Sequence, residues 1–330
     1  MRFLRRPLEK EMSAQHSQIA PTPPHGELQS AITHALAGRY TILHTLAQGG
    51  TAVLFLARHP VLSSLFVVRV LLPSLAGDPS VLAHFRSEGL IGAGLSGHPH
   101  VLPIVDAGEA LGLPYMVMPY VEGEDLDRLL FRLGRLSYAD TLLLAMQVAD
   151  ALHYASRLGI LHGDLSPGNL RINRFGMVIV FDFGLMRTEV SAQSPAVAEQ
   201  FHRSMATPLY ISPERIRAQP FDIRSDLYSL GAVLYEALTG VAAFHGDTLE
   251  QIEQRHLAGD VDFSHRELQT HPEFQQLLKQ LLALDPDSRI ASPADLQASL
   301  ARLAPSLPRI AAEVDASCTV IRRSRLSAAH

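Results

Sequence analysis

Two short polar stretches of the chain carry residue types that could perform chemistry. The first covers residues 162–169 and contains Asp164 and Asn169, and the second begins at Asp182. The residues between them predict two short apolar strands around an Asn/Gly turn, which brings both stretches to the ends of one hairpin. Carboxylate and amide oxygens are hard ligands that suit Mg²⁺ carrying a nucleotide's phosphates, which leaves Asp164 as a base for an incoming hydroxyl. The set therefore predicts phosphoryl transfer, a reaction that depends on positioning and charge neutralisation.

The composition is that of a globular protein with a large core. The chain has 330 residues, 47% of them apolar and 18% charged, which suits one two-lobed domain or two small domains. A net charge of −5 argues against a bulk basic field for nucleic acid or an anionic membrane. No apolar run reaches the roughly 18–20 residues of a membrane span, and the N-terminus lacks the pattern of a secretory signal. The single cysteine, Cys318, excludes a disulfide framework, and we expect a cytoplasmic protein.

The first part of the chain has the pattern of an antiparallel sheet with one helix. Residues 1–38 are polar and aperiodic and predict a flexible tail. A helix is expected to begin after the capping residue Asp78. It should loosen toward its end, because Gly89, Gly92 and Gly94 each cost about 1 kcal/mol of helix propensity. Strands are expected at residues 40–46, 53–58, 65–71, 101–107 and 115–120.

The second part of the chain is predicted to be mostly helical. Ser137 begins a long helix, Asp140 completes a capping box three residues later, and Gly159 ends the helix. Residues 185–205 predict a long mobile loop, and 305–330 predict a second flexible tail. Further helices are expected at residues 227–239, 248–258, 273–284 and 293–303. A β-rich lobe followed by a helical lobe, with acidic loops at the seam, indicates a ligand site between the lobes.

These motifs resemble those of a known family. The stretch 162–169 resembles the family's catalytic loop, and Asp182-Phe183-Gly184 resembles its metal-binding loop. Further motifs occur in the family's order: residues 98–101 after the regulatory helix, 207–214 at the end of the activation segment, 226–240 as the central helix, and 284–289, whose Arg289 pairs with Glu214. Over about residues 39–304, the chain resembles the eukaryotic-type (Hanks-type) serine/threonine protein kinases, especially their bacterial members.

The resemblance implies an α+β, two-lobed protein-kinase fold. A small N-lobe of antiparallel sheet with one regulatory helix is expected over residues 39–118, and a larger, mostly helical C-lobe over residues 122–304. The implied ligands are ATP and Mg²⁺, bound between the lobes. The implied partner is a protein substrate or a regulated protein.

The resemblance also implies roles for individual residues. Asp164 would be the catalytic base, and Asn169 and Asp182 would complete the catalytic set by holding Mg²⁺. The nucleotide would be contacted from the glycine turn, the third strand, the regulatory helix, the hinge and the pocket floor. These residues are Gly49, Gly50, Arg69, Glu88, Met118, Pro119, Val121 and Arg171.

Two lysines that the family uses on phosphate are replaced. Arg69 stands where a third-strand lysine would grip the α- and β-phosphates, and Ser166 stands where a lysine would contact the γ-phosphate. Arginine keeps the charge, but its planar fork is bulkier than an ammonium group. Lys10 and Lys279 are the only lysines in the chain, and neither is expected in the cleft.

The expected adenine pocket and its control differ from the family pattern as well. Val67 replaces the usual alanine of the pocket roof, and Arg171 replaces an apolar floor residue. Arg171 would either stack on a purine or fill the pocket. Gly163 replaces the arginine that reads activation-loop phosphate, which argues against control by that route.

Three functions remain open. The first is an active or weakly active serine/threonine protein kinase, supported by Asp164, Asn169 and Asp182. The second is a pseudokinase that regulates a partner, since losing one transition-state contact typically costs about 10²–10³ in rate. The third is a small-molecule phosphotransferase of the aminoglycoside type, which shares the His-Gly-Asp-x-x-x-x-Asn pattern. That class lacks the 207–214, 226–240 and 284–289 motifs, so the sequence disfavours it.

Overall fold

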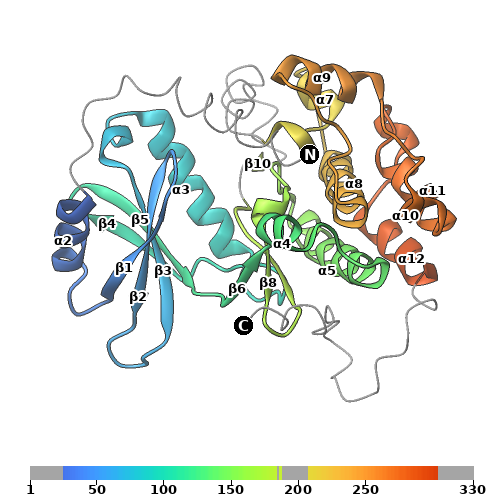
Figure 1. Ribbon diagram of the computed structural model, residues 1–330. Helices are drawn as coiled ribbons and strands as arrows, with labels where there is room; N and C mark the ends of the chain where they lie inside the picture. The colour runs from blue at the N-terminus through green and yellow to red at the C-terminus, as the bar shows by residue number, and fades with distance from the viewer. Residues whose placement is uncertain (1–24, 184–185, 188–206, 304–330) are drawn as a thin grey trace. The chain divides into compact units, whose positions relative to one another are not determined.

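The structure is a computed structural model that describes residues 25–183, 186–187 and 207–303 (Figure 1). The chain divides into two compact units. The N-unit comprises Met1–Gly97 and Leu102–Val121, and the C-unit comprises His98–Val101 and Glu122–His330. The predicted α+β class is confirmed, because the N-unit holds a five-stranded antiparallel sheet and the C-unit is mostly helical.

The N-unit is built on one sheet with the strand order β1-β2-β3-β5-β4. Its strands are β1 (Thr41–Gln48), β2 (Ala52–Arg58), β3 (Leu65–Leu71), β4 (Asp106–Ala110) and β5 (Leu113–Pro119). The strand predicted at 101–107 is wrong for most of its length, since β4 begins only at Asp106. Pro103 lies in that stretch, and a proline has no N–H to donate to a ladder.

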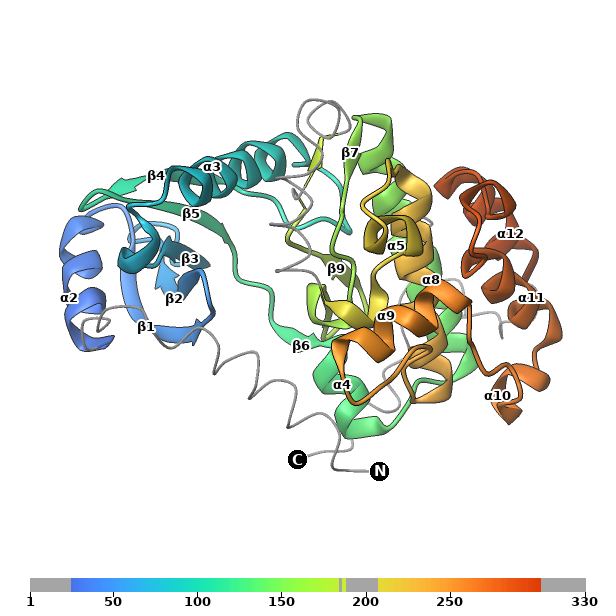
Figure 2. The ribbon, with the colours of Figure 1, turned by 90° about the horizontal axis from the view of Figure 1, so that it is seen from above.

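The two faces of this sheet carry separate apolar clusters. Alternate residues of a strand point to opposite faces. Val68 and Val70 therefore join one buried cluster, while Leu71 joins another with Phe85 and Met116. Helix α3 (Pro79–Gly94) contributes Phe85 to the second cluster, and Figures 1 and 2 show α2 and α3 on different sides of the sheet.

Helix α2 (His25–Ala35) covers the face that α3 does not. Leu28, Ile32 and Leu36 recur at four-residue spacing, and all three are buried in the first cluster. The prediction of a flexible tail over residues 1–38 is therefore wrong for this segment. The helix is held by packing on an apolar face of the sheet. The polar sequence around the helix gives no indication of this packing.

Helix α3 stays regular to its end, so the predicted loosening is wrong. Its glycines serve close packing instead. A Cβ at Gly92 would lie 2.4 Å from Cγ1 of Ile104, and one at Gly89 would lie 3.2 Å from Sδ of Met116. The predicted cap is present, since the Asp78 side chain accepts hydrogen bonds from the first turn.

The C-unit packs its helices around α8. The bounds are α4 (Leu126–Leu133), α5 (Tyr138–Arg157), α7 (Pro213–Ile216), α8 (Ile223–Thr239), α9 (Leu249–Ala258), α10 (Arg266–Gln269), α11 (Pro272–Leu281) and α12 (Pro293–Leu303). Every residue of α8 from Ser225 to Leu238 is buried, and Gly240 ends the helix in the left-handed region with φ of 82°. The capping box of Ser137 and Asp140 is confirmed at the start of α5.

The predicted hairpin of the C-unit is also present. Strand β8 (Leu170–Asn173) pairs with β9 (Val178–Val180) and with β6 (Gly123–Asp125). Strand β10 (Met186–Arg187) pairs with β7 (Ile160–Leu161) inside the predicted 185–205 loop. The remainder of that loop and the 305–330 tail lie outside the described residues. None of the described helices is long and apolar enough to cross a membrane.

We predict that Ile32→Ala destabilises the N-unit by about 2–5 kcal/mol, because it removes a fully buried side chain and leaves a cavity under α2. Urea unfolding followed by circular dichroism measures the loss, since the chain has no tryptophan. Ser30→Ala on the exposed side of the same helix is the matched control. Equal stability of Ile32→Ala and wild type would show that α2 does not support the sheet.

Candidate active site

The backbone of the 162–169 loop is held from below by one buried carboxylate. Asp226, in the first turn of α8, accepts hydrogen bonds from the N–H of His162 at 2.7 Å and of Gly163 at 2.8 Å. Burial raises the pKa of Asp226 to about 6, against these two N–H groups, which favour the carboxylate. The loop therefore depends on α8 for its position.

His162 joins the loop to the chain on the other side of the hairpin. Burial lowers its pKa to about 4, so the ring is neutral near pH 7. Its Nδ1 accepts from the N–H of Asp164 at 3.2 Å, so Nε2 carries the proton and donates to the Phe181 carbonyl at 3.1 Å. The Phe181 N–H in turn donates to the Asn169 carbonyl at 3.1 Å. These bonds bring the two predicted polar stretches together.

Both oxygens of the Asp164 carboxylate accept hydrogen bonds. Oδ1 accepts from the Thr207 N–H at 3.1 Å, and Asn169 Nδ2 donates to the Asp164 carbonyl at 2.8 Å and to Oδ2 at 3.4 Å. Burial raises the pKa of Asp164 to about 6, against the opposing effects of the Thr207 N–H and the charge of Arg215. A carboxylate with a pKa near the working pH is suited to accept a proton.

Asp182 and Asn169 fit the expected metal. Asp182 is exposed, with φ of 58° in the left-handed region that residues other than glycine rarely adopt. Because the Asn169 amide nitrogen faces Asp164, its amide oxygen is turned away and remains available as a ligand. No group of three His, Cys, Asp or Glu side chains suited to a metal occurs in the described ranges. Mg²⁺ commonly keeps waters and phosphate oxygens as its other ligands, so a carboxylate and an amide suffice on the protein side.

The two remaining predicted positions of the C-unit have local polar roles. Ser166 is only 4% exposed and precedes the short turn η2 (Pro167–Asn169), where its carbonyl accepts from the Asn169 N–H. Arg171 lies opposite Asp125 in the β6–β8 pair, and donates to Asp125 Oδ1 at 2.5 Å and to the Gly123 carbonyl at 2.7 Å. The guanidinium of Arg171 is thus held along β6.

In the N-unit, the structure brings Arg69 and Glu88 together. Arg69 lies on β3, opposite Met116 of β5, and Glu88 lies on the buried side of α3. Arg69 Nη1 and Glu88 Oε1 form an ion pair, and the guanidinium lies 5.6 Å from the centre of the Phe85 ring. The third-strand cation and the acid of α3 are therefore paired in the N-unit.

The glycine turn and the hinge residues lie at opposite ends of the N-unit sheet. Gly49 and Gly50 join β1 to β2, and a Cβ added at Gly50 would meet nothing within 4 Å in the described structure. Internal packing does not require glycine there, and the missing side chain leaves the backbone open to close approach. Met118 and Pro119 end β5, with Met118 buried opposite Val67, and the partly buried Val121 follows.

Comparison with known proteins agrees with this geometry. A family model described as protein kinase domain matches residues 40–300. The chain belongs to the protein kinase family. The match begins after α2, so this helix is an addition to the part of the kinase domain that the family model describes.

Bacterial serine/threonine kinases are among the relatives of this kinase domain. Serine/threonine-protein kinase PknB of Mycolicibacterium smegmatis is 34% identical over 289 residues, which cover 85% of this chain and 46% of that protein. PknB of Mycobacterium leprae is 33% identical over 306 residues, covering 90% and 47%. A probable PknB of Bifidobacterium longum is 37% identical over 241 residues, covering 70% and 34%. The chain spans less than half the length of these relatives.

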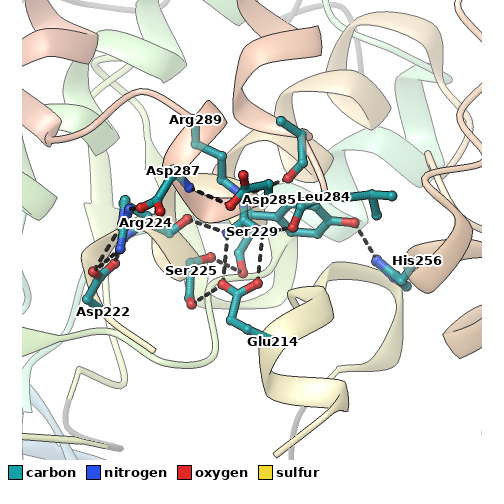
Figure 3. Close-up of polar contacts among 12 residues, drawn as sticks. Glu214, Asp222, Arg224, Ser225, Ser229, His256, Leu284, Asp285, Asp287 and Arg289 are labelled. Atoms are coloured by element: carbon teal, nitrogen blue, oxygen red, sulfur yellow. Dashed lines mark hydrogen bonds and ion pairs between the residues drawn. The ribbon is translucent and has the colours of Figure 1, made fainter. Parts of the chain in front are cut away.

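The predicted pair of Glu214 and Arg289 is confirmed as a buried, fully bonded cluster (Figure 3). Arg289 Nη1 and Nη2 donate to the two Glu214 oxygens at 2.8 and 2.7 Å, and both side chains are almost completely buried. The other donors reach the carbonyls of Ala283, Arg224 and Leu284, so all five N–H groups of Arg289 are used. Ser225 also donates to Glu214, which ties α7 to the start of α8.

One residue that sequence reasoning missed lies next to this cluster. Arg215 is 3% exposed, and its Nη1 donates to the carbonyl of Gly163. The sequence shows only an arginine after Glu214 in a short helix, where an exposed side chain is the usual outcome. Its burial follows from the tertiary packing of α7 and could not be predicted from residue type or spacing.

Breaking the buried cluster should cost more than breaking an exposed one. Arg289→Met leaves Glu214 as an unpaired buried charge, and we predict a loss of about 3–5 kcal/mol in the free energy of unfolding. Arg224→Met, which removes ion pairs with Asp222 and Asp287 near the surface, should cost less than about 1 kcal/mol. Urea unfolding of both variants measures the difference. Similar losses in the two variants would contradict the dominant role of the Glu214 pair.

His256 should make the stability of the C-unit depend on pH. Burial lowers its pKa from 6.5 to about 3, and its Nδ1 lies 2.8 Å from the Tyr228 hydroxyl. The unfolded chain binds the proton first as the pH falls below 6.5, so the free energy of unfolding should fall between pH 6.5 and 3. The fall should be shallower in His256→Asn and unchanged in His44→Asn, an exposed control. Parallel curves for wild type and His256→Asn, measured by denaturation at several pH values, would exclude this contribution.

Proposed function

We propose that the chain is a serine/threonine protein kinase-like protein that binds Mg-ATP and transfers phosphate slowly to protein hydroxyl groups. The observation that carries the proposal is the set formed by Asp164, Asn169 and Asp182. Asp164 is held by hydrogen bonds to Asn169 and Thr207, and Asp182 follows on the loop that His162 ties to the same site. The names of the bacterial relatives support the choice of protein serine and threonine as acceptors.

In the proposed reaction, Asp164 accepts the proton of the acceptor hydroxyl as the hydroxyl oxygen attacks the γ-phosphorus. The bond between the γ-phosphorus and the bridging oxygen of ATP breaks, and ADP leaves. Asn169 and Asp182 would hold Mg²⁺, which would supply positive charge to neutralise the phosphate oxygens. In the N-unit, the proposal assigns phosphate binding to Arg69, which pairs with Glu88, and to the turn at Gly49 and Gly50. Met118, Pro119, Val121 and Arg171 contribute to the adenine pocket.

Slow transfer is expected because the phosphate-side charges are fewer than the family pattern provides. Arg69 is committed to an ion pair with Glu88, and its charge is spread over a planar fork. Ser166 is buried in the 162–169 loop and carries no charge. Each missing contact to a developing charge is typically worth about 10²–10³ in rate.

Two other functions are less well supported. A pseudokinase that regulates a protein partner is favoured by the same two replacements, Arg69 and Ser166. A small-molecule phosphotransferase of the aminoglycoside type shares the 162–169 pattern. It is disfavoured by the Glu214–Arg289 cluster, because that class lacks the motifs that build it.

The deciding experiment is phosphate transfer from Mg-ATP to a generic protein acceptor, with Asp182→Asn as the control. We expect slow incorporation on serine and threonine, reduced by about 10²–10³ in Asp182→Asn because one metal ligand loses its charge. Equal incorporation in wild type and Asp182→Asn would contradict the proposed site. A thermal shift with Mg-ATP but no transfer would favour the pseudokinase, and no shift at millimolar nucleotide would argue against nucleotide binding itself.

Arg69→Lys provides a second arm of the experiment. A lysine can pair with Glu88 and present a compact charge to phosphate, so we expect kcat/KM for ATP to rise at least about tenfold. Arg58→Lys at the exposed end of β2 is the matched control and should leave the rate unchanged. Unchanged kcat/KM in Arg69→Lys would locate the defect elsewhere in the nucleotide site.

A further inference from the structure

Arg215 is a buried cation that forms no ion pair with the residues that the structure describes. It lies in α7, its guanidinium carbon is 5.3 Å from the centre of the Phe221 ring, and Nη1 donates to the Gly163 carbonyl. Its Nε is buried and has no hydrogen-bond partner among the described residues. Burying a charge costs free energy unless it is paired. Arg289 differs in this respect, because it is a buried structural arginine and all its N–H groups are hydrogen-bonded.

The acceptor of Arg215 is the peptide that leads directly into Asp164. The carbonyl of this peptide belongs to Gly163 and is held by Arg215. Its N–H belongs to Asp164 and donates to Nδ1 of His162 at 3.2 Å. The preceding N–H, of Gly163 itself, donates to Asp226 at 2.8 Å. Gly163 has φ of 79°, which glycine adopts without steric cost. Glycine populates negative φ about as readily, so its own backbone preference does not fix this conformation. The hydrogen bonds on both edges of the peptide therefore set its direction.

The surrounding charges explain why a cation is used for this hydrogen bond. The positive charge of Arg215 acts through space on the carboxylates of Asp164 and Asp226 and favours their ionised forms. A neutral donor at the same place would hold the carbonyl but would add no positive charge beside these two carboxylates. Nε is buried, and the guanidinium lies against the Phe221 ring, away from water. Its electric field is therefore weakly screened.

We propose that Arg215 is a positioning residue for phosphoryl transfer, which holds the Gly163–Asp164 peptide and thereby aims the Asp164 carboxylate at the acceptor hydroxyl. The proposal rests on the proposed function for its kinetic consequence. Its structural part, that Arg215 holds this peptide, stands on the hydrogen bond to Gly163 alone. Arg215 acts through the loop backbone and needs no contact with nucleotide.

Three variants test whether a charged donor is needed at this position. Arg215→Met removes the donor and the charge, Arg215→Gln leaves a neutral amide whose nitrogen is two bonds nearer to Cα than Nη1, and Arg215→Lys keeps a charged donor. Because only one N–H of Arg215 is bonded to Gly163, lysine can replace it here, unlike at a bidentate site. Arg135→Met, which removes an ion pair with Glu267 that does not involve the loop, is the matched control.

The first measurement is steady-state phosphate transfer by the full chain with Mg-ATP. We expect kcat to fall on the order of 10²-fold in Arg215→Met with KM for ATP within about twofold, because misplacing a reacting group by about 1 Å has that effect. Arg215→Gln should be intermediate, Arg215→Lys should recover most of kcat, and Arg135→Met should equal wild type. Wild-type kcat in a folded Arg215→Met would overturn the proposal. A loss in Arg215→Lys as large as that in Arg215→Met would also overturn it.

The second measurement does not need activity. Amide hydrogen exchange, read by mass spectrometry on the peptide that contains residues 162–165, should be faster in Arg215→Met and wild-type-like in Arg215→Lys and Arg135→Met. If wild type transfers no phosphate, the proposed function fails, and this comparison still decides whether Arg215 holds the loop. Unchanged exchange in Arg215→Met overturns the proposal, and so does faster exchange spread evenly over the C-unit. If Arg215→Met does not fold, the same comparison between Arg215→Gln and Arg215→Lys is decisive.

Discussion

The buried pair of Glu214 and Arg289 is the interaction on which the geometry of the C-unit's site depends. It fixes α7 against the turn before α12, and the Ser225 hydroxyl extends it to the start of α8. The next residue along each element then reaches the 162–169 loop, Arg215 from α7 and Asp226 from α8. Because a bidentate buried pair is costly to break, the two residues that contact Gly163 are both anchored to one rigid cluster. The position of the loop is thus decided by packing well away from Asp164.

The charges around the loop are arranged so that its carboxylates remain ionised at near-neutral pH. Burial raises the pKa values of Asp164 and Asp226, each to about 6, and backbone N–H groups and Arg215 oppose that effect. His162 is neutral, because its burial is not offset by the charge of Asp182. Among the described residues, backbone donors and one buried arginine therefore carry the electrostatics around Asp164. In the N-unit, Arg69 forms an ion pair with Glu88.

The sequence was sufficient wherever a local rule decides the outcome. The caps at Asp78 and Ser137 and the glycine stop at Gly240 follow from backbone hydrogen bonding, and all are present. The Glu214–Arg289 pair was implied by the resemblance to the kinase family. The predictions that failed concern features that depend on tertiary packing. Helix α2 owes its place to the apolar outer face of the sheet, the glycines of α3 to Ile104 and Met116, and the burial of Arg215 to the docking of α7.

In this kinase domain, the residues that hold the 162–169 loop differ from those to which the proposed function assigns the slow transfer. The contacts that hold the 162–169 loop come from Asp226, Arg215 and His162, and none involves the two positions where family lysines are replaced. Under the proposed function, Arg69 and Ser166 set the charge near the phosphates, whereas Asp226, Arg215 and His162 hold the backbone next to the base. A change at Glu214 or Arg289 would reach the base as well, because α7 and α8 carry Arg215 and Asp226. The position of Asp164 therefore depends on the buried packing of the C-unit, and the proposed slow transfer is attributed to residues outside that packing.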